Sequence, residues 1–171
     1  PETFHSDTGI NCAGAWASTI DPTVTANLPV KPVRGQIVLL ESHPPLFRHA
    51  LHSAECYLVP RSDGRLLIGS TMENVGYDKR VTAEAVARLI QAATRISPHI
   101  NQCTFREAWA GLRPDTPDDL PIIGQADLPG LLIATGHFRN GILLAPITAK
   151  VITEMLLSGK PSIDLDPFSP R

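Results

Sequence analysis

The pattern of hydrophobic and polar positions predicts a β-rich stretch from Val33, followed by one amphipathic helix. Apolar, β-branched runs indicate strands at Val33–Glu41, Cys56–Pro60 and Leu66–Thr71. Between the last two strands, Arg61–Arg65 carries an Asp-Gly pair of the kind that closes a β-hairpin. These two strands are therefore predicted to form a hairpin with Asp63-Gly64 at its tip.

Apolar residues recur at helical spacing after Thr82. They are Val86, Leu89, Ile90, Ala93 and Ile96. This stripe predicts a surface helix that covers the sheet, with the Thr82 side chain as its N-cap. Beyond the helix, Thr104–Pro114 is apolar enough to return to a strand, and the following Thr-Pro-Asp-Asp stretch predicts a turn into one more short strand.

The last third of the chain joins an apolar strand, Leu131–Thr135, to an apolar helical segment, Ile142–Leu157, through the turn Gly136–Gly141. Backbone amides at such a turn and the positive end of the helix dipole favour an electron-rich or anionic ligand. An ordinary connection between a strand and a helix has the same spacing. However, a turn that only connects a strand to a helix does not require an arginine, whose planar guanidinium carries five hydrogen-bond donors. Arg139 therefore indicates that the turn is a binding site.

The N-terminal segment is typical of half a nucleotide-binding βα unit. Ile10–Gly14 has the pattern of a strand end, and Ala15–Ile20 has the pattern of a helix start. No Gly-x-Gly-x-x-Gly motif and no initiating Met precede them. We therefore expect the C-terminal part, or a separate chain, of a larger protein, and we expect the strand end to have no sheet partner within these residues.

Composition and charge limit the classes of binding partner and the cellular compartment that we expect. A net charge of −2 gives no reason to expect nucleic acid or an anionic membrane. No apolar run approaches the roughly 20 residues that span a bilayer, and no signal pattern opens the chain. The cysteines Cys12, Cys56 and Cys103 are odd in number and widely spaced, which favours a reducing cytoplasm over a disulfide framework.

Three histidines, His43, His49 and His52, lie close together in sequence. Prolines interrupt their spacing, and no carboxylate or cysteine ligand accompanies them at a metal-binding interval. No metal site is therefore predicted.

Five motifs occur in a fixed order: NCAGAW, VRGQI, CYLVPRSDGRLLIGSTME, WAGLRPDTPDDLPIIG and ATGHFRNGILLAP. With them the chain, from about Ile10 to the end of the last helix, resembles the C-terminal half of the FAD-dependent D-amino-acid oxidase and glycine oxidase family. It is most similar to the glycine oxidases associated with thiamine biosynthesis. The resemblance implies an α+β fold, with the antiparallel-sheet substrate domain of a two-domain FAD oxidoreductase and the last strand and helix of its nucleotide-binding domain.

The resemblance also implies a division into three segments. Residues 1–32 would be a remnant of the FAD-binding domain, residues 33–125 the substrate-binding domain, and residues 126–171 the return segment with the flavin-facing turn and final helix. FAD retention would then need the N-terminal nucleotide-binding segment, upstream in the same gene or present as a second chain. Where sarcosine oxidases of this group attach flavin to a cysteine, this chain reads Gly-Leu-Arg-Pro, so the FAD is expected to be non-covalent.

Four substrate-binding residues follow from the resemblance. Arg113 matches the arginine that grips the substrate carboxylate, and its planar fork suits a bidentate contact. Tyr57 matches a tyrosine whose hydroxyl reaches the same carboxylate. Arg139 matches an arginine near the substrate amine and the flavin edge. Met72 matches a residue lining the side-chain pocket, although a flexible thioether is equally suited to filling the core.

The cofactor-binding residues implied by the resemblance lie in two segments. They are Ala13, Gly14, Trp16, Gly136, His137, Phe138, Arg139, Asn140, Gly141, Ile142 and Leu143. Those from 137 to 143 match the stretch facing the pyrimidine end of the flavin, where backbone amides and the helix dipole stabilise negative charge. Glu55 departs from the pattern because it replaces a histidine of glycine oxidase, and a carboxylate there would change the field at the entrance.

The implied reaction is the oxidative deamination of glycine, sarcosine or a small D-amino acid, with O2 reoxidising the flavin to give hydrogen peroxide. No catalytic side chain is assigned, because the flavin carries the chemistry when the substrate amine arrives neutral. A flavin dehydrogenase of the same fold is one alternative, and a non-catalytic fragment that needs its N-terminal half to bind FAD is another. Besides the amino acid and O2, a homo-oligomeric partner is compatible with the sequence.

Overall fold

The computed structural model describes residues 2–3 and 5–170, and the chain forms two compact units. The sheet unit is Val33–Leu112, and the terminal unit combines Pro1–Pro32 with Arg113–Arg171. Both helices and antiparallel strands are present, so the α+β class predicted from the sequence is confirmed.

The sheet unit contains a five-stranded sheet in the order β3-β4-β5-β2-β6. Its strands are β2 (Lys31–Glu41), β3 (Leu51–His52), β4 (Tyr57–Pro60), β5 (Arg65–Gly69) and β6 (Thr104–Asp115). The predicted hairpin is confirmed, since β4 and β5 are antiparallel with Tyr57 opposite Gly69 and Pro60 opposite Leu66. Strand β2 continues the antiparallel pairing on the other side of β5, with Ile37 also opposite Gly69.

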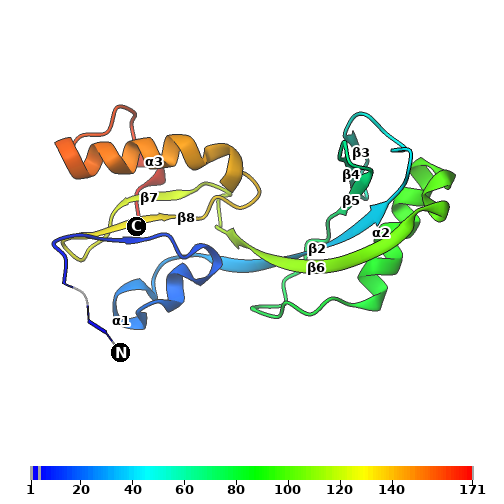
Figure 1. Ribbon diagram of the computed structural model, residues 1–171. Coiled ribbons are helices and arrows are strands. Elements are labelled where there is room, and N and C mark those ends of the chain that lie inside the picture. The colour runs from blue at the N-terminus through cyan, green and yellow to red at the C-terminus, as the bar shows by residue number, and fades with distance from the viewer. Residues whose placement is uncertain (1, 4, 171) are drawn as a thin grey trace. The chain divides into compact units, whose positions relative to one another are not determined.

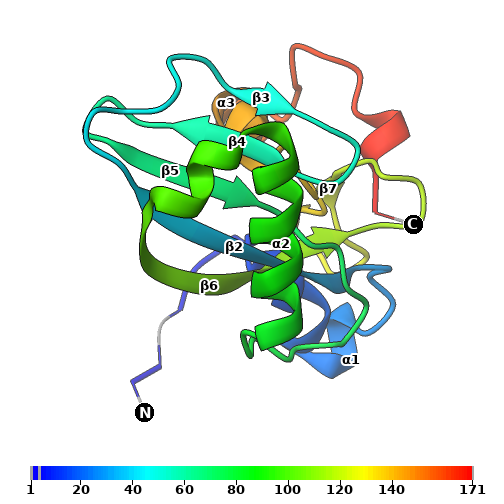
Figure 2. The same ribbon diagram turned by 90° about the vertical axis from the view of Figure 1, so that its right-hand side faces the viewer.

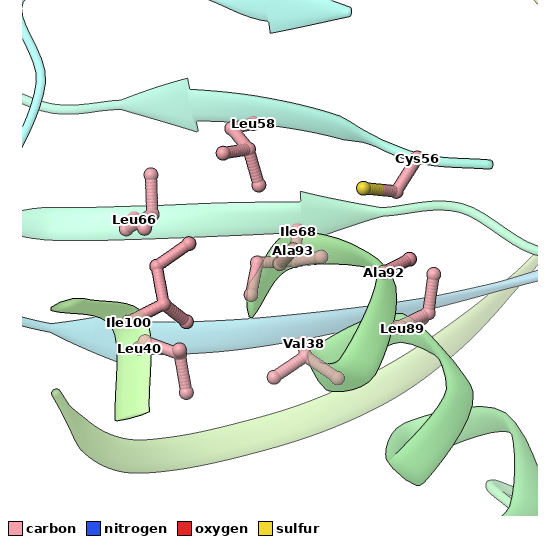
Figure 3. Close-up of a cluster of buried hydrophobic side chains, with 10 residues drawn as sticks. All are labelled: Val38, Leu40, Cys56, Leu58, Leu66, Ile68, Leu89, Ala92, Ala93 and Ile100. Carbon is pink, nitrogen blue, oxygen red and sulfur yellow. The ribbon is translucent and has the colours of Figure 1, made fainter. Parts of the chain in front are cut away.

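Helix α2 (Ala83–Ile96) lies across one face of this sheet, as predicted (Figure 2). The Thr82 hydroxyl caps it by accepting a hydrogen bond from the Ala85 amide at 3.3 Å, and the 3-10 helix η2 (Pro98–Gln102) follows. The core between helix and sheet is shown in Figure 3 and consists of Val38, Leu40, Cys56, Leu58, Leu66, Ile68, Leu89, Ala92, Ala93 and Ile100. Burying each large side chain of this kind contributes about 1.5–3 kcal/mol, so this layer fixes the position of the sheet.

The terminal unit contains a three-stranded sheet in the order β1-β8-β7. Strand β1 (Gly9–Asn11) is parallel to β8 (Leu131–Thr135), and β7 (Ile122–Gln125) is antiparallel to β8. The expectation that the N-terminal strand end has no sheet partner in this chain is therefore wrong. The return segment brings β8 alongside β1, with Ile10 opposite Leu132, and satisfies that edge. Because β7 pairs with β8, residues 113–125 belong to this unit and not to the sheet unit.

Helix α3 (Gly141–Ser158) covers one face of the small sheet (Figure 1). The buried residues between them are Ile123, Leu132, Ala134, Val151 and Ile152. The helix ends at Gly159, whose left-handed backbone (φ 69°) lets its amide donate to the Met155 carbonyl at 3.1 Å. By length and composition α3 could cross a membrane, contrary to the expectation that no apolar run approaches that length. Within the terminal unit only 11% of this stretch is buried, and its buried residues are Val151 and Ile152.

Short helices complete the terminal unit. The helix start predicted at Ala15–Ile20 is a 3-10 helix, η1 (Gly14–Thr19). It cannot continue past Asp21, whose backbone is extended because Pro22 follows. Helix α1 (Pro22–Thr25) then begins with the Asp21 carboxylate accepting from the Thr23 amide at 2.9 Å. Near the C-terminus, η3 (Asp166–Phe168) packs against β7.

Candidate functional site

The turn between β8 and α3 is built around Gly136. Its backbone is left-handed (φ 75°), and a Cβ there would lie 2.7 Å from Thr116 Cγ2 and 3.3 Å from the Ile122 nitrogen. Only glycine fits both restrictions. The chain can therefore turn sharply out of the buried strand and present residues 137–140 at the start of α3.

One hydrogen bond ties this turn to the end of β6, and a second lies within the turn. The Phe138 amide donates to the Pro114 carbonyl at 3.0 Å, and the Asn140 amide donates to the His137 carbonyl at 2.8 Å. Pro114 directly follows Arg113, and Phe138 directly precedes Arg139. The structure thus brings together the backbone segments that carry the two arginines predicted to contact substrate.

The exposed end of the turn has the character expected of a flavin-edge site. Arg139 and Asn140 are exposed, and so are the first apolar side chains of α3, Ile142 at 96% and Leu143 at 76%. A helix N-terminus offers backbone donors and partial positive charge, which suits the carbonyl-rich pyrimidine edge of a flavin. The apolar residues beside it suit a flat aromatic ring, so the residues present fit FAD.

His137 anchors the turn to the helix. Its Nε2 atom lies 2.9 Å from the Thr148 hydroxyl oxygen, and the ring is half-buried. Burial lowers the pKa of His137 below its ordinary value, so the imidazole is neutral near neutral pH.

This shift predicts a pH-dependent contribution to stability. Because the unfolded chain binds a proton at His137 more readily than the folded chain does, the free energy of unfolding should fall as pH drops through about 6.5. The loss should be smaller in His137→Gln, whose side chain does not titrate. Urea unfolding of both proteins at pH 7.5 and pH 5.5 measures the difference, and an identical loss in the two proteins would contradict the assignment.

The second predicted cofactor segment lies beside the first. The Thr135 hydroxyl, one residue before Gly136, donates to the Gly14 carbonyl at 3.0 Å. Buried Asn11 shapes the same segment, since its amide nitrogen donates to the Ala17 carbonyl at 2.9 Å and its side-chain oxygen accepts from the Ala13 amide at 3.1 Å. Sequence reasoning missed Asn11 and Thr135. A polar residue at the end of each apolar strand was the available signal.

Other predicted residues of this segment are open to contact. Trp16 is 43% exposed, and Gly14 has a left-handed backbone (φ 57°) with open space where a Cβ would stand. Gly14 and Gly136 thus lie on two neighbouring segments at the same end of β1 and β8.

The remaining two predicted substrate residues, Tyr57 and Met72, lie in the sheet unit. The ring of half-buried Tyr57 lies across Gly69, where any Cβ would overlap it. Met72 is 59% exposed on the connection that follows β5, so the role as core filler does not apply. The structure places Tyr57 and the start of this connection at the same end of the β4–β5 hairpin.

Glu55 has a partner that the sequence did not reveal. Its carboxylate accepts a hydrogen bond from Arg95 Nε at 3.0 Å, and Arg95 lies in the last turn of α2. The expected change in local field is therefore offset by a cation, although both side chains are more than half exposed and the pair is screened by solvent.

Within residues 2–3 and 5–170, no three His, Cys, Asp or Glu side chains cluster in a way that could hold a metal ion. Of the three clustered histidines, His43 instead pairs with Glu41 at 2.7 Å, and the ring of His52 packs 5.8 Å from that of Tyr57.

Comparison with known proteins identifies relatives along nearly the whole chain. The chain is 43% identical over 167 residues to hydrogen cyanide synthase subunit HcnC of Pseudomonas aeruginosa, covering 96% of this chain and 40% of that protein. It is 37% identical to glycine oxidase of Pseudomonas putida, covering 97% of this chain and 46% of the relative. The chain thus spans less than half the length of the curated relatives it matches.

Solved structures agree with these relationships. The crystal structure of glycine oxidase from Geobacillus kaustophilus superposes with a TM-score of 0.91 at 35% identity, covering 98% of this chain and 46% of that one. The family model described as FAD dependent oxidoreductase (DAO) matches residues 2–155. By its sequence and its fold, this chain belongs to the DAO family of FAD-dependent oxidoreductases.

Proposed function

We propose that the protein containing this chain oxidises a small amino acid, such as glycine, sarcosine or a small D-amino acid, with O2 as the final electron acceptor. The observation that carries the proposal is the hydrogen bond from Phe138 to Pro114, which joins the flavin-edge turn to the strand end bearing Arg113. The backbone of Arg113, which we propose binds the substrate carboxylate, is thereby fixed relative to the Gly136–Gly141 turn. Fixing a substrate in one orientation is worth several kcal/mol to a reaction rate.

Each site residue has a defined task in this proposal. Arg113 binds the substrate carboxylate through its guanidinium fork, and the Tyr57 hydroxyl donates to the same carboxylate. Arg139 borders the amine and the flavin edge, and Met72 lines the space around the substrate side chain. FAD, when bound, supplies the acceptor for the hydride that leaves the substrate Cα. The resulting imine hydrolyses to a 2-oxo acid and ammonia, or to a 2-oxo acid and methylamine when the substrate is sarcosine. O2 takes up two electrons and two protons from the reduced flavin to give hydrogen peroxide.

The share of the relatives that this chain covers supports a further part of the proposal. Because the chain spans 40–46% of their length, the whole protein would include an FAD-binding segment of comparable size. The exposed apolar residues of α3 supply a surface for that segment. They include Ile142, Leu143, Ile147, Leu156 and Leu157. We infer that these residues contact that segment and not a lipid bilayer, since Lys150 and Glu154 form an ion pair in the middle of the helix.

The identity to HcnC supports a second candidate, a subunit of a hydrogen cyanide synthase. A dehydrogenase that passes electrons to a carrier is a third. Product analysis of the complete, FAD-loaded protein with glycine separates them. Glyoxylate, ammonia and peroxide in equal amounts support the oxidase. Cyanide would replace the first proposal by the second, and turnover that needs an added electron acceptor would support the third.

Arg139 offers a test of the flavin-edge assignment. Arg139→Ala in the complete protein should lower turnover and also lower the flavin reduction potential, because removing a cation beside the flavin destabilises its negatively charged reduced form. Potentiometric titration and steady-state kinetics measure the two effects. Arg48→Ala, which removes an exposed arginine of the sheet unit, is the control. If Arg139→Ala changes only the stability, with normal kinetics and a normal flavin potential, the flavin-edge assignment is wrong and Arg139 has a structural role.

A further inference from the structure

Two buried polar residues on β2 face the connection that carries Met72. Arg34 is 4% exposed and Gln36 is 1% exposed, and both lie in the sheet unit. They are two residues apart on a strand, so their side chains emerge from the same face. Burying a cation or an amide costs free energy of desolvation unless the group is fully hydrogen-bonded. The hydrogen-bond partners of Arg34 and Gln36 therefore indicate the role of these two residues.

Arg34 makes its bonds to the connection between β5 and α2. Its Nε atom donates to Glu73 Oε2 at 3.0 Å, and a second guanidinium nitrogen donates to the same carboxylate oxygen. The third nitrogen donates to the Arg80 carbonyl at 3.0 Å and pairs with the Asp78 carboxylate at 3.1 Å. The backbones of Arg34 and Glu73 also exchange two hydrogen bonds, at 2.9 and 3.0 Å.

Gln36 fixes the two ends of the same connection. Its backbone amide donates to the Thr71 hydroxyl at 2.8 Å, and its side-chain oxygen accepts from the Thr82 amide at 2.8 Å. Its side-chain nitrogen donates to Glu73 Oε1 at 2.9 Å. Glu73 is therefore held by both β2 residues. Burial raises its pKa, but the hydrogen bonds from Thr71, Arg34 and Gln36 outweigh this and lower it, so the carboxylate stays charged.

Other side chains of the connection are apolar or aromatic and are at least 40% exposed. Thr71 and Glu73 are turned toward β2, while Met72 between them is 59% exposed. Val75 is 40% exposed and Tyr77 is 42% exposed. A segment anchored at alternate positions has little freedom to move its exposed residues, so the outward position of Met72 depends on Arg34, Gln36 and Glu73.

We propose that Arg34, Gln36 and Glu73 are positioning residues that hold the 71–82 connection as a rigid apolar wall, and that this wall limits the size of the substrate side chain. The inference rests on the proposed amino-acid oxidation and extends it to substrate selection. Glycine has no side chain to meet the wall, whereas a D-amino acid with a larger side chain does. One methylene against a fixed apolar wall is worth roughly 10- to 200-fold in kcat/KM.

Gln36→Glu tests the proposal in the complete FAD-loaded protein. The new carboxylate has the same shape but meets Glu73 without a proton to donate, so the connection should loosen. We expect the ratio of kcat/KM for D-norvaline to that for glycine to rise at least fivefold, with kcat for glycine unchanged within twofold. Amide hydrogen exchange of residues 71–82 should accelerate. Gln91→Glu, an exposed position on α2, makes the same chemical change and should alter neither quantity.

A swapped pair provides the rescue. In Gln36→Glu with Glu73→Gln, one donor and one acceptor again face each other, so both the selectivity ratio and the exchange rates should return toward wild type. If Gln36→Glu does not fold, Glu73→Gln alone must show the same rise in ratio. Faster exchange with an unchanged ratio, or unchanged exchange, would overturn the positioning role. Failure of the wild-type protein to oxidise any amino acid would instead refute the proposed function, and with it this role.

Discussion

Replacing Arg113 by alanine in the complete FAD-loaded protein is expected to raise KM for glycine about tenfold to hundredfold. The substitution removes a charge-assisted contact to the substrate carboxylate, and such contacts contribute about 1.5–3 kcal/mol. Arg113→Lys keeps the charge but loses the planar fork, so it should recover only part of the loss. Steady-state kinetics with glycine and sarcosine measure the effect.

Two controls separate recognition from general damage. Arg48→Ala removes an exposed arginine that the proposal does not use, and KM should stay at its wild-type value. An amine that lacks a carboxylate, such as ethylamine, should lose little further activity in Arg113→Ala, because the missing contact was never made with it. If KM for glycine is unaltered in Arg113→Ala, Arg113 does not bind the substrate carboxylate.

Replacing Gly136 by alanine is expected to destabilise the terminal unit strongly. A left-handed backbone costs an ordinary residue about 1–2 kcal/mol, and overpacking costs about 1–3 kcal/mol more. The new methyl would meet Thr116 Cγ2 at 2.7 Å. Thr116 has little room to yield, since it is buried and its hydroxyl donates to the Leu120 carbonyl at 2.8 Å. Urea unfolding of the complete protein, followed by circular dichroism, measures the loss.

Matched variants divide this loss into its two causes. Gly141→Ala changes a glycine of the same turn, where a Cβ would meet only His137 Cβ at 3.8 Å, so stability should change by less than about 1 kcal/mol. Adding Thr116→Ser to Gly136→Ala removes the clashing methyl and keeps a hydroxyl at that position. The double variant should recover the overpacking part and retain the conformational part. Equal stability of Gly136→Ala and wild type would show that the turn is not built as described.

Local patterns predicted most of the regular structure. The β4–β5 hairpin followed from an Asp-Gly pair between apolar runs, and α2 followed from its apolar stripe and the capping hydroxyl of Thr82. These elements depend on nearby residues and on one buried face, which is the information that periodicity carries.

Long-range pairing was not predictable from the same patterns. Strand β1 lies beside β8, although more than 110 residues separate them, and neither segment encodes the other's register. For the same reason the bond from Thr135 to Gly14, and the Arg34–Glu73 pair, appear only in the folded chain. Glu55 was correctly noticed as unusual, but its pairing with Arg95 depends on where the end of α2 lies.

In the candidate site, too, local features were predicted from the sequence and long-range contacts were not. The sequence indicated the turn at Gly136–Gly141 because glycine spacing and a buried strand are local signals. It could not show that the turn is held by the Pro114 carbonyl, since that contact joins segments 24 positions apart. The roles of Arg113, Tyr57, Arg139 and Met72 came from family resemblance, and the kinetic experiments above test Arg113 and Arg139 directly.

The central claim is that a small amino acid bound by this chain reduces FAD in the complete protein. Anaerobic addition of glycine or sarcosine to the FAD-loaded protein, followed by absorption near 450 nm, tests it most directly. The flavin band should bleach in a single exponential phase, at a rate that saturates with substrate concentration, and it should return when O2 is admitted. A flavin band that persists with glycine, sarcosine and small D-amino acids alike would contradict the account.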